Sequence, residues 1–564
     1  MARTVGIGIQ DFEKMIRIHN FYIDRTGFIR DWWENADEVT LITRPRRFGK
    51  TLTVSMLEHF FSIQYKEQGD IFQNLAIWKD EKFRRLQGTY PVICLSFANV
   101  KENTCKEVKR HIGQILTELY DRHIFLLEGD LLTRKEKSYF CSIDPDMDEL
   151  TAVLALHRLS DFLFRYYGKK VIILLDEYDT PMQEAYIHGF WQQLASYMRN
   201  MLNAVFKTNP YLERALMTGI TRVSKESIFS DLNHLEVVTT TSEKYKDVFG
   251  LSEEEVFLAL EEYGLSAQRQ SVKDWYDGFV FGGQADIYNP WSVINCLDKR
   301  KLSAYWANSS SNGLADRLIR ESSAGIKADF EELLKGKSLE KEVDEQVVFD
   351  QLSRDENAIW SLLLACGYLK VEKVTTEEES GVEYYTLSLT NKEVRMMFRN
   401  MVKGWFAKDR TVYNQFIKAL LLGDVDAMNQ YMNRVSRDIF STFDTGKKPS
   451  EETEPERFYH GFVLGLMVEL SGRYVLTSNR ESGFGRYDVM LEPLREEDDA
   501  ILLEFKVYDP GKEKTLEETV ERALMQIREK EYASVLESKG IPHNRIRLYG
   551  FGFRGKEVLI GHGQ

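Results

Sequence analysis

The sequence predicts an α/β protein: a parallel sheet with helices on both faces, a mainly helical middle region, and a smaller C-terminal α/β region. Short apolar runs in the first third are separated by helix-length segments, which is the pattern of a parallel sheet. The last quarter reads as helix, three strands, helix and strand. The polar, proline-containing stretch 446–456 precedes that quarter, so we predict three regions, 1–245, 246–445 and 446–564.

The composition is that of an ordinary globular protein, with 564 residues of which 43% are hydrophobic. The formal charge of -14 argues against constant nonspecific binding to nucleic acid, although metal-binding acids would also lower it, so nucleic acid stays open as a partner. The five cysteines form no CxxC pair, which predicts neither disulfides nor a zinc site. No apolar run approaches about 18 residues and no signal-peptide pattern opens the chain, so we expect a cytoplasmic protein without a membrane span.

The first predicted strand, loop and helix lie in ADEVTLITRPRRFGKTLTVSMLEHFF. Gly49, Lys50 and Thr51 fill the second half of the phosphate-binding pattern G-x-x-x-x-G-K-[ST], in which backbone amides wrap the phosphates, the lysine reaches the outer phosphates and the hydroxyl binds magnesium. Arg44 stands where the first glycine belongs, and Pro45 removes one amide donor. A basic turn that caps a helix would give the same letters, so the motif alone is weak.

The run VIILL at 171–175 predicts a buried parallel strand that ends in Asp176 and Glu177. At the carboxyl end of such a strand Asp176 can hold magnesium through water, and Glu177 can polarise the attacking water. Acids after a strand can also be simple helix caps. The combination with the GKT sequence favours a nucleotide site.

Two further apolar runs, at 90–97 and 214–222, complete the predicted sheet. Thr218 places a polar side chain at the end of the second run, where a γ-phosphate is commonly sensed, and Arg222 follows it. A polar loop residue and a solvated cation are the alternatives for these two positions.

RPRRFGKT, LLDEYDTP, GITRVSKESIFSDLNHL and WYDGFVFGG with IYNPWS together resemble the bacterial AAA-ATPase-like family. Its members typically join a P-loop NTPase-type region to a C-terminal nuclease-like domain of the PD-(D/E)XK superfamily, and RPRRFGK is usual in it. The resemblance implies ATP binding by Lys50 and Thr51, with Asp176 and Glu177 as the metal and water acids.

The arginines Arg44, Arg46 and Arg47 could replace the lost amide contacts with charged donors to phosphate. One of them could instead act on the nucleotide of a neighbouring subunit in a homo-oligomer, or they could dock a DNA backbone. The sequence leaves these three roles open.

The middle region begins with Ser252 and Glu255 as a capping box for a helix. The aromatic residues and glycines of WYDGFVFGGQADIYNPWS predict a compact hairpin in a small lid or winged-helix-like module. A base-stacking platform is the alternative, and packing is the favoured interpretation. Strand signals at 367–374 and 384–390 interrupt an otherwise helical pattern.

The C-terminal region places Asp488 inside its second predicted strand, and Glu504 and Lys506 near the end of its third. Because side chains alternate along a strand, Glu504 and Lys506 share a face, and Asp488 joins them if the strands pair. Two carboxylates can hold Mg²⁺ or Mn²⁺, which activates water, while the lysine orients the nucleophile or neutralises charge. This order of elements resembles the core of PD-(D/E)XK nucleases; polar strand ends without a function are the alternative.

Gln526, with Tyr532 further along, matches the glutamine–tyrosine helix found in many members of this nuclease class. It could contact the site or a DNA backbone, and a solvated helix face is the alternative. Glu469 and His460 on a predicted helix at 458–470 could complete the acid cluster, although His460 fits a partly buried structural histidine better.

These patterns favour an ATPase that controls or moves a metal-dependent nuclease acting on DNA, with ATP and Mg²⁺ or Mn²⁺ as cofactors. Similar bacterial proteins suggest a setting in mobile-element or phage conflict. The alternative is a nucleotide-dependent binding switch whose nuclease-like fold serves recognition without cleavage. A pure binding module has no chemical reason to keep Asp488, Glu504 and Lys506 together, which argues against that alternative.

Overall fold

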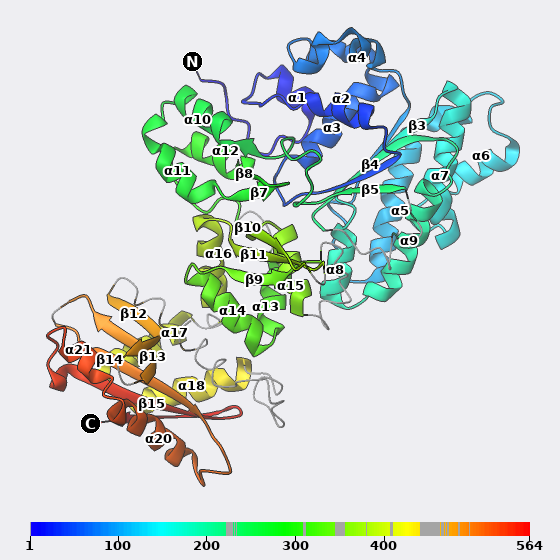
Figure 1. The fold of residues 1–564 in the computed structure, drawn as a ribbon. Helices are drawn as coiled ribbons and strands as arrows, with labels where there is room; N and C mark the ends of the chain where they lie inside the picture. Colours follow the sequence, from blue (N-terminus) through cyan, green and yellow to red (C-terminus); the bar gives the residue numbers. More distant parts are fainter. Residues whose placement is uncertain are drawn as a thin grey trace. The chain divides into compact units, whose positions relative to one another are not determined.

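The chain forms two compact units in the computed structural model, which Figure 1 draws as a ribbon. The first unit is 1–318 with 338–396, and the second is 319–337 with 397–564. The predicted three-region division stays a proposal, and its boundary at 446 lies outside the described residues. No helix in the described part of the chain is long and apolar enough to cross a membrane. The described residues are 2–221, 229, 232, 234–307, 312–344, 356–378, 381–405, 410–439, 463, 467, 470, 473–482, 485–495 and 497–563.

The first unit contains a five-stranded parallel sheet in the order β2-β3-β4-β1-β5. Strands β1 and β3 are buried along their whole length, as expected for a parallel sheet that helices cover on both faces. The predicted α/β sheet is therefore confirmed. Its strands are β1 (Val39–Thr43), β2 (Val92–Ser96), β3 (Val171–Asp176), β4 (Leu212–Gly219) and β5 (Leu235–Val238).

The helices around this sheet begin and end where the local sequence favours it. The side chains of Thr104 and Asp148 cap the N-termini of α5 and α7, and α7 ends at Gly168 in the left-handed conformation. Helix α3 begins directly after Gly49, so the turn that follows β1 leads straight into it. The helices are α1 (Phe12–Arg17), α2 (Gly27–Asn35), α3 (Lys50–Phe61), α4 (Glu81–Leu86), α5 (Cys105–Asp121), α6 (Arg134–Cys141), α7 (Glu149–Tyr167), α8 (Thr180–His188) and α9 (Trp191–Phe206).

The first unit continues beyond β5 with helices and two small sheets, β6-β8-β7 and β10-β11-β9. Helix α10 begins at the predicted capping box of Ser252 and Glu255. Strands β7 and β8 form the predicted hairpin, which turns at Gly282 and Gly283 with positive φ at both. The elements are β6 (Leu251–Ser252), α10 (Glu253–Glu262), α11 (Arg269–Tyr276), β7 (Phe279–Phe281), β8 (Gln284–Tyr288), α12 (Pro290–Lys299), β9 (Leu339–Glu342), α15 (Glu356–Ala365), β10 (Leu369–Thr376) and β11 (Glu383–Leu389). Helices α13 (Gly313–Glu321) and α16 (Lys392–Trp405) begin in this unit and end in the second.

The second unit contains a mixed sheet in the order β12-β13-β14-β15-β16. Strands β14 and β15 run parallel and the other neighbours antiparallel. The predicted strands are present, and the long helix predicted over 515–537 is divided into α20 and α21. Strand β16 was not predicted, and the expected helix at 458–470 lies mostly outside the described residues. The elements are α14 (Ala324–Leu334), α17 (Arg410–Leu422), α18 (Val425–Ile439), β12 (Tyr474–Ser482), β13 (Gly485–Pro493), β14 (Ala500–Val507), α20 (Leu516–Glu529), α21 (Ala533–Glu537), β15 (Ile546–Arg554) and β16 (Glu557–Gly563).

Alternate residues of β14 face opposite sides of this sheet. Leu503 and Phe505 pack in the core that α17 and α18 cover, whereas Leu502 packs with α20. Helix α20 lies so close to β15 that a Cβ atom added at Gly550 would stand 2.7 Å from the Val520 carbonyl oxygen. Glu504 therefore projects on the α20 side.

Candidate active sites

The phosphate-type loop runs from the end of β1 into α3 and holds its lysine closely. The Lys50 Nζ atom donates hydrogen bonds to the carbonyl oxygens of Arg44, at 2.9 Å, and Pro45, at 3.1 Å. It also lies 3.6 Å from the Glu177 carboxylate. Both Gly49 and Arg47 have positive φ, which gives the loop its turn although arginine replaces the first glycine. The loop thus places its lysine beside the acid that follows β3.

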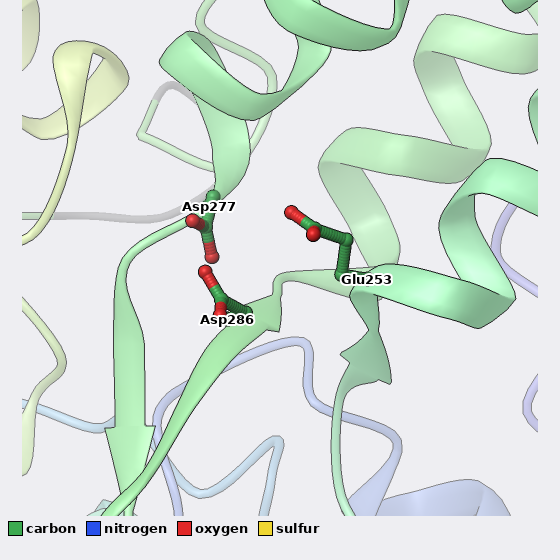
Figure 2. A group of neighbouring side chains, drawn as sticks. All are labelled: Glu253, Asp277 and Asp286. Atoms are coloured by element: carbon green, nitrogen blue, oxygen red, sulfur yellow. The ribbon is translucent and has the colours of Figure 1, made fainter.

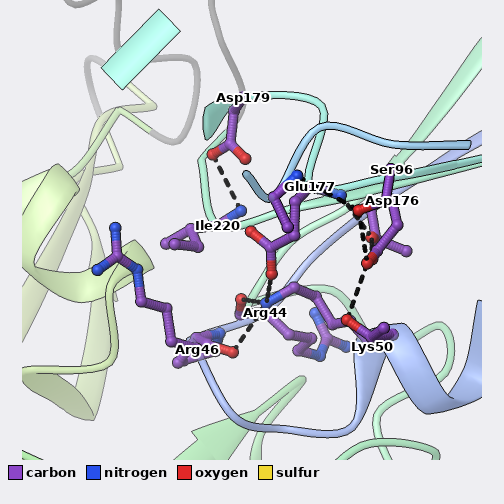
Figure 3. A network of polar contacts seen from close by, with 12 residues as sticks. Arg44, Arg46, Lys50, Ser96, Asp176, Glu177, Asp179 and Ile220 are labelled. Carbon is purple, nitrogen blue, oxygen red and sulfur yellow. Dashed lines mark hydrogen bonds and ion pairs between the residues drawn. The ribbon is translucent and has the colours of Figure 1, made fainter. Parts of the chain in front are cut away.

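Asp176 brings together hydroxyl groups from three other elements, as Figure 3 shows. Its carboxylate accepts hydrogen bonds from Thr51 at 2.8 Å and Thr218 at 2.5 Å, and a longer one from Ser96 at 3.4 Å. Burial raises the pKa of Asp176, and the nearby Glu177 charge adds to this, while Thr218, Thr51 and Lys50 oppose it. A carboxylate beside a hydroxyl at the ends of parallel strands is a donor set suited to Mg²⁺. Ser96 was not predicted, although it is the polar end of the YPVICLSF run.

Glu177 stands beside this carboxylate in an uncommon backbone conformation. Its φ of 51° is left-handed, and its amide donates to the Thr218 hydroxyl at 3.3 Å. Strain of this kind in a non-glycine residue persists where the surroundings enforce it, and it concentrates at functional sites. The predicted residues Lys50, Thr51, Asp176, Glu177 and Thr218 are therefore neighbours in space, and Arg222 lies outside the described residues.

The three loop arginines make different contacts. The Arg44 side chain is fully buried and donates to the carbonyl oxygens of Thr239 and, at 3.4 Å, Tyr245. This geometry favours a structural role over contact with phosphate. Arg46 donates to the Gln183 side-chain oxygen at 3.0 Å, and the Arg47 guanidinium lies 4.4 Å from the centre of the Trp291 ring.

Asp179, a further acid of the LLDEYD run without a predicted role, is fully buried. One of its carboxylate oxygens accepts hydrogen bonds from the amides of Ile220, at 3.0 Å, and Thr221, at 2.9 Å. Figure 3 shows the first of these contacts. Gly219 lies so close to residues 178 and 179 that an added Cβ atom would stand 2.7 Å from the Tyr178 ring. Asp179 therefore fixes the chain just beyond Thr218, and the second aspartate of the run is the sequence signal that could have found it.

A second acidic centre lies on β13 and β14. Since Val489 pairs with Leu503 in an antiparallel register, Asp488 stands opposite Glu504 on the same face. The Asp488 carboxylate accepts a hydrogen bond from the Phe505 amide at 2.8 Å, and the Glu504 carboxylate accepts one from the Asp488 amide at 3.4 Å. The two acids from different strands are therefore held together by the sheet itself.

Lys506 and Gln526 complete this centre. The Lys506 ammonium lies 3.3 Å from Glu504, and the Gln526 amide on α20 donates to the same oxygen. Tyr532 lies behind Gln526, with its hydroxyl 3.4 Å from the Gln526 nitrogen. The glutamine–tyrosine pair thus faces the acids, with Tyr532 buried and Gln526 partly buried.

Glu504 is the acid of the second centre whose pKa is raised by its surroundings. Burial, and then the negative charge of Asp488, raise the pKa of Glu504 to about 8, and Lys506 opposes this. A divalent cation between the two carboxylates would relieve the repulsion, so the donor set fits a metal ion. The expected contributors His460 and Glu469 lie outside the described residues.

A third acidic group, drawn in Figure 2, lies in the β7–β8 region. Glu253, Asp277 and Asp286 each offer a carboxylate oxygen, and these atoms lie within 4.8 Å of one another. Lys273 donates to Glu253 and, at 3.1 Å, to Asp286, and the Tyr288 hydroxyl donates to Glu253. Because the lysine already supplies positive charge here, the group is explained as an ion-pair network.

Known proteins resemble both regions that carry the two acidic centres. Residues 6–229 match the family described as Predicted AAA-ATPase, and residues 454–563 match the PD-(D/E)XK nuclease superfamily. A protein of Azotobacter chroococcum mcd 1, described as an uncharacterized protein in the vnfD 5' region, is 24% identical over 395 residues, or 70% of this chain and 68% of that protein. The solved Aeropyrum pernix ORC2 protein (ADPNP-ADP complexes) matches with a TM-score of 0.22 and 10% identity over 67% of this chain and 92% of that chain. The two family matches confirm the predicted chain order.

Proposed function

We propose, starting from an AAA-ATPase-like region followed by a PD-(D/E)XK nuclease-superfamily region, that this chain hydrolyses ATP to control a metal-dependent nuclease acting on DNA. The observation that carries the nuclease half is the convergence of Asp488, Glu504 and Lys506, with Gln526 behind them. A setting in mobile-element or phage conflict is part of the same proposal and rests only on resemblance.

Each residue of the first centre would have a separate role in ATP hydrolysis. Lys50 offers its charge to the outer phosphates, and Thr51 with Asp176 would hold Mg²⁺. When bound, that ion would neutralise phosphate charge. Glu177, 3.6 Å from Lys50, would orient the attacking water, and Thr218 ties the end of β4 to Asp176. Arg46, Arg47 and Gly49 belong to the loop that would hold the phosphates.

The residues of the second centre suit phosphodiester hydrolysis. Asp488 and Glu504 would hold Mg²⁺ or Mn²⁺, which when bound lowers the pKa of a water and stabilises charge on the phosphate. Lys506 would hold the nucleophile or the developing charge, and Gln526 keeps Glu504 oriented. Both acids must be deprotonated to bind the ion, so activity should rise with pH.

The deciding experiment incubates purified protein with Mg²⁺ or Mn²⁺ and labelled single-stranded DNA, double-stranded DNA or RNA, with and without ATP. Glu504→Ala is the test variant, and Glu529→Ala, an exposed acid on α20, is the matched control. We expect metal-dependent DNA cleavage that Glu504→Ala abolishes and Glu529→Ala retains, with a rate that changes when ATP is added.

Each other outcome has a distinct meaning. Cleavage of RNA alone would contradict the DNA substrate, and cleavage indifferent to ATP would contradict the coupling. If wild type leaves every substrate intact, the nuclease proposal fails and a nucleotide-dependent binding switch becomes the better reading.

A further inference from the structure

The RPRRF segment of the phosphate loop is held by residues that follow β5, within the same unit. The chain there lies beyond the AAA-ATPase-like match, which ends at 229. Arg44 binds carbonyl oxygens of the 239–245 segment, Arg47 stacks on Trp291, and Phe48 packs edge to face with Phe279 and Phe281. Pro45 lies so close to Gly367 that a Cβ atom there would stand 2.7 Å from the proline ring. Arg44, which replaces the first glycine of the pattern, and the neighbouring Pro45 thus both lie at an internal interface.

The main-chain carbonyl of Arg46 receives two donors from this later part of the chain. The Trp306 indole Nε1 donates to it at 3.0 Å, and the Asn289 side-chain amide at 3.5 Å. In a trans peptide the carbonyl and the next amide point in opposite directions. Fixing the Arg46 carbonyl therefore fixes the direction of the Arg47 amide, one of the donors on which a phosphate loop depends.

A buried carboxylate holds the tryptophan in place. Glu393, in the first turn of α16, is fully buried and accepts hydrogen bonds from the amides of Trp306, at 2.7 Å, and Ala307, at 3.3 Å. It also accepts from the Ser292 hydroxyl at 2.8 Å, and Ser292 donates its own amide to the Asn289 side chain at 3.1 Å. Both donors to the Arg46 carbonyl are thus tied to one acid. Burial raises the pKa of Glu393 to about 7.

We propose that Asn289, Trp306 and Glu393 form a clamp that presets the phosphate loop for nucleotide, with Trp306 and Glu393 as positioning residues. The inference rests on the proposed nucleotide binding and adds a role for the chain beyond residue 229. A glycine-rich loop loses conformational entropy when it binds phosphate, whereas a loop already held by side chains loses less. By thermodynamic reciprocity, a nucleotide that prefers the ordered loop also stabilises the clamp.

The first test compares Trp306→Phe with Trp360→Phe by titrating a fluorescent ATP analogue and by steady-state ATP hydrolysis. Both tryptophans are buried in the first unit, and phenylalanine at 306 keeps the aromatic packing but removes the indole donor. Loss of one hydrogen bond predicts about five-fold weaker nucleotide binding for Trp306→Phe, seen in KM with kcat little changed. Trp360→Phe should bind as wild type does.

The second test separates positioning from general packing. Glutamine at 393 can accept from the Trp306 and Ala307 amides and donate to Ser292, so Glu393→Gln should bind ATP as wild type does, while Glu393→Ala should bind it at least about five-fold more weakly. In hydrogen exchange, ATP should protect amides in 289–307 of wild type and of Glu393→Gln, and less so in Trp306→Phe.

The outcomes separate the clamp from the underlying function. If wild type binds ATP and Trp306→Phe binds it equally, with the same protection of 289–307, the clamp is overturned while the ATPase proposal stands. If Trp360→Phe weakens binding as much as Trp306→Phe, the effect is general packing and the clamp again fails. If wild type binds no nucleotide, both proposals fall.

Discussion

The two acidic centres differ in the groups that surround their buried carboxylates. Asp176 is surrounded by hydroxyl donors, with Lys50 nearby. Glu504 faces a second carboxylate and accepts hydrogen bonds from Lys506, from the Gln526 side-chain amide and from the Asp488 backbone amide. Burial raises the pKa of both acids, but the charge of Asp488 helps to take that of Glu504 to about 8. The carboxylate of the first centre is thus largely satisfied by neighbouring hydroxyl groups, whereas the second centre holds two carboxylates that repel each other.

The largest effect is expected at the loop lysine. Lys50→Ala removes the only phosphate-directed charge that the G-K-[ST] pattern provides, so ATP turnover should fall by at least about 10²-fold. Lys79→Ala, at an exposed lysine outside the loop sequence, is the control, and malachite-green phosphate release is the measurement. If Lys50→Ala leaves ATP turnover unchanged, the first centre is not the nucleotide site, and the contrast between an ATPase centre and a nuclease centre is lost.

Glu177→Gln should separate binding from chemistry. The amide keeps the size of the side chain but cannot polarise water as a carboxylate does, so hydrolysis should drop about 10²-fold while the affinity for ATP stays within a few-fold of wild type. Equilibrium binding and single-turnover hydrolysis measure the two quantities. Full hydrolysis by this variant would move the water-orienting role to another residue.

The folding stability of the second unit should depend on pH through the raised pKa of Glu504. Its folded-state pKa of about 8 is raised above the ordinary 4.5, so between these values the folded state binds more protons than the unfolded state. The stability of the second unit without divalent ion should therefore be full below about pH 4.5 and decline as pH rises toward 8, by at most about 1.4 kcal/mol per pH unit.

Urea unfolding followed with and without Mn²⁺ checks this. The ion should flatten the decline, because it favours the charged carboxylate, and Glu504→Gln should flatten it without the ion. A decline that Glu504→Gln leaves unchanged would show that another group is titrating.

The smallest effect is expected at Gln526. Because its amide donates to Glu504 and stands beside the Tyr532 hydroxyl, Gln526→Ala should lower nuclease turnover about ten-fold without abolishing it, as expected for loss of a supporting hydrogen bond. Initial rates of DNA cleavage over a range of Mn²⁺ concentrations are the measurement. If Gln526→Ala is as inactive as Glu504→Ala, Gln526 belongs instead among the groups that touch substrate or metal.

Local sequence was sufficient where a pattern is short and periodic. The capping box at Ser252 and the hairpin glycines Gly282 and Gly283 depend on neighbouring residues alone, and each is confirmed. The Glu504-x-Lys506 spacing on one strand likewise needed only the alternation of side chains. Ser96 and Asp179 were missed because their importance arises from strands and turns distant in sequence.

The sequence by itself determined that a parallel sheet and a C-terminal set of strands form, which acids those strands carry, and that a lysine and a threonine follow the first strand. These features depend on short-range periodicity and on the chemistry of each side chain. Only the tertiary structure decided what the loop arginines contact. The sequence leaves three roles open for Arg44, whereas in the structure its guanidinium binds carbonyl oxygens of the 239–245 segment. Trp306 lies 260 residues from the Arg46 carbonyl that it binds. Contacts over such separations are set by how the whole chain packs, and no local pattern encodes them.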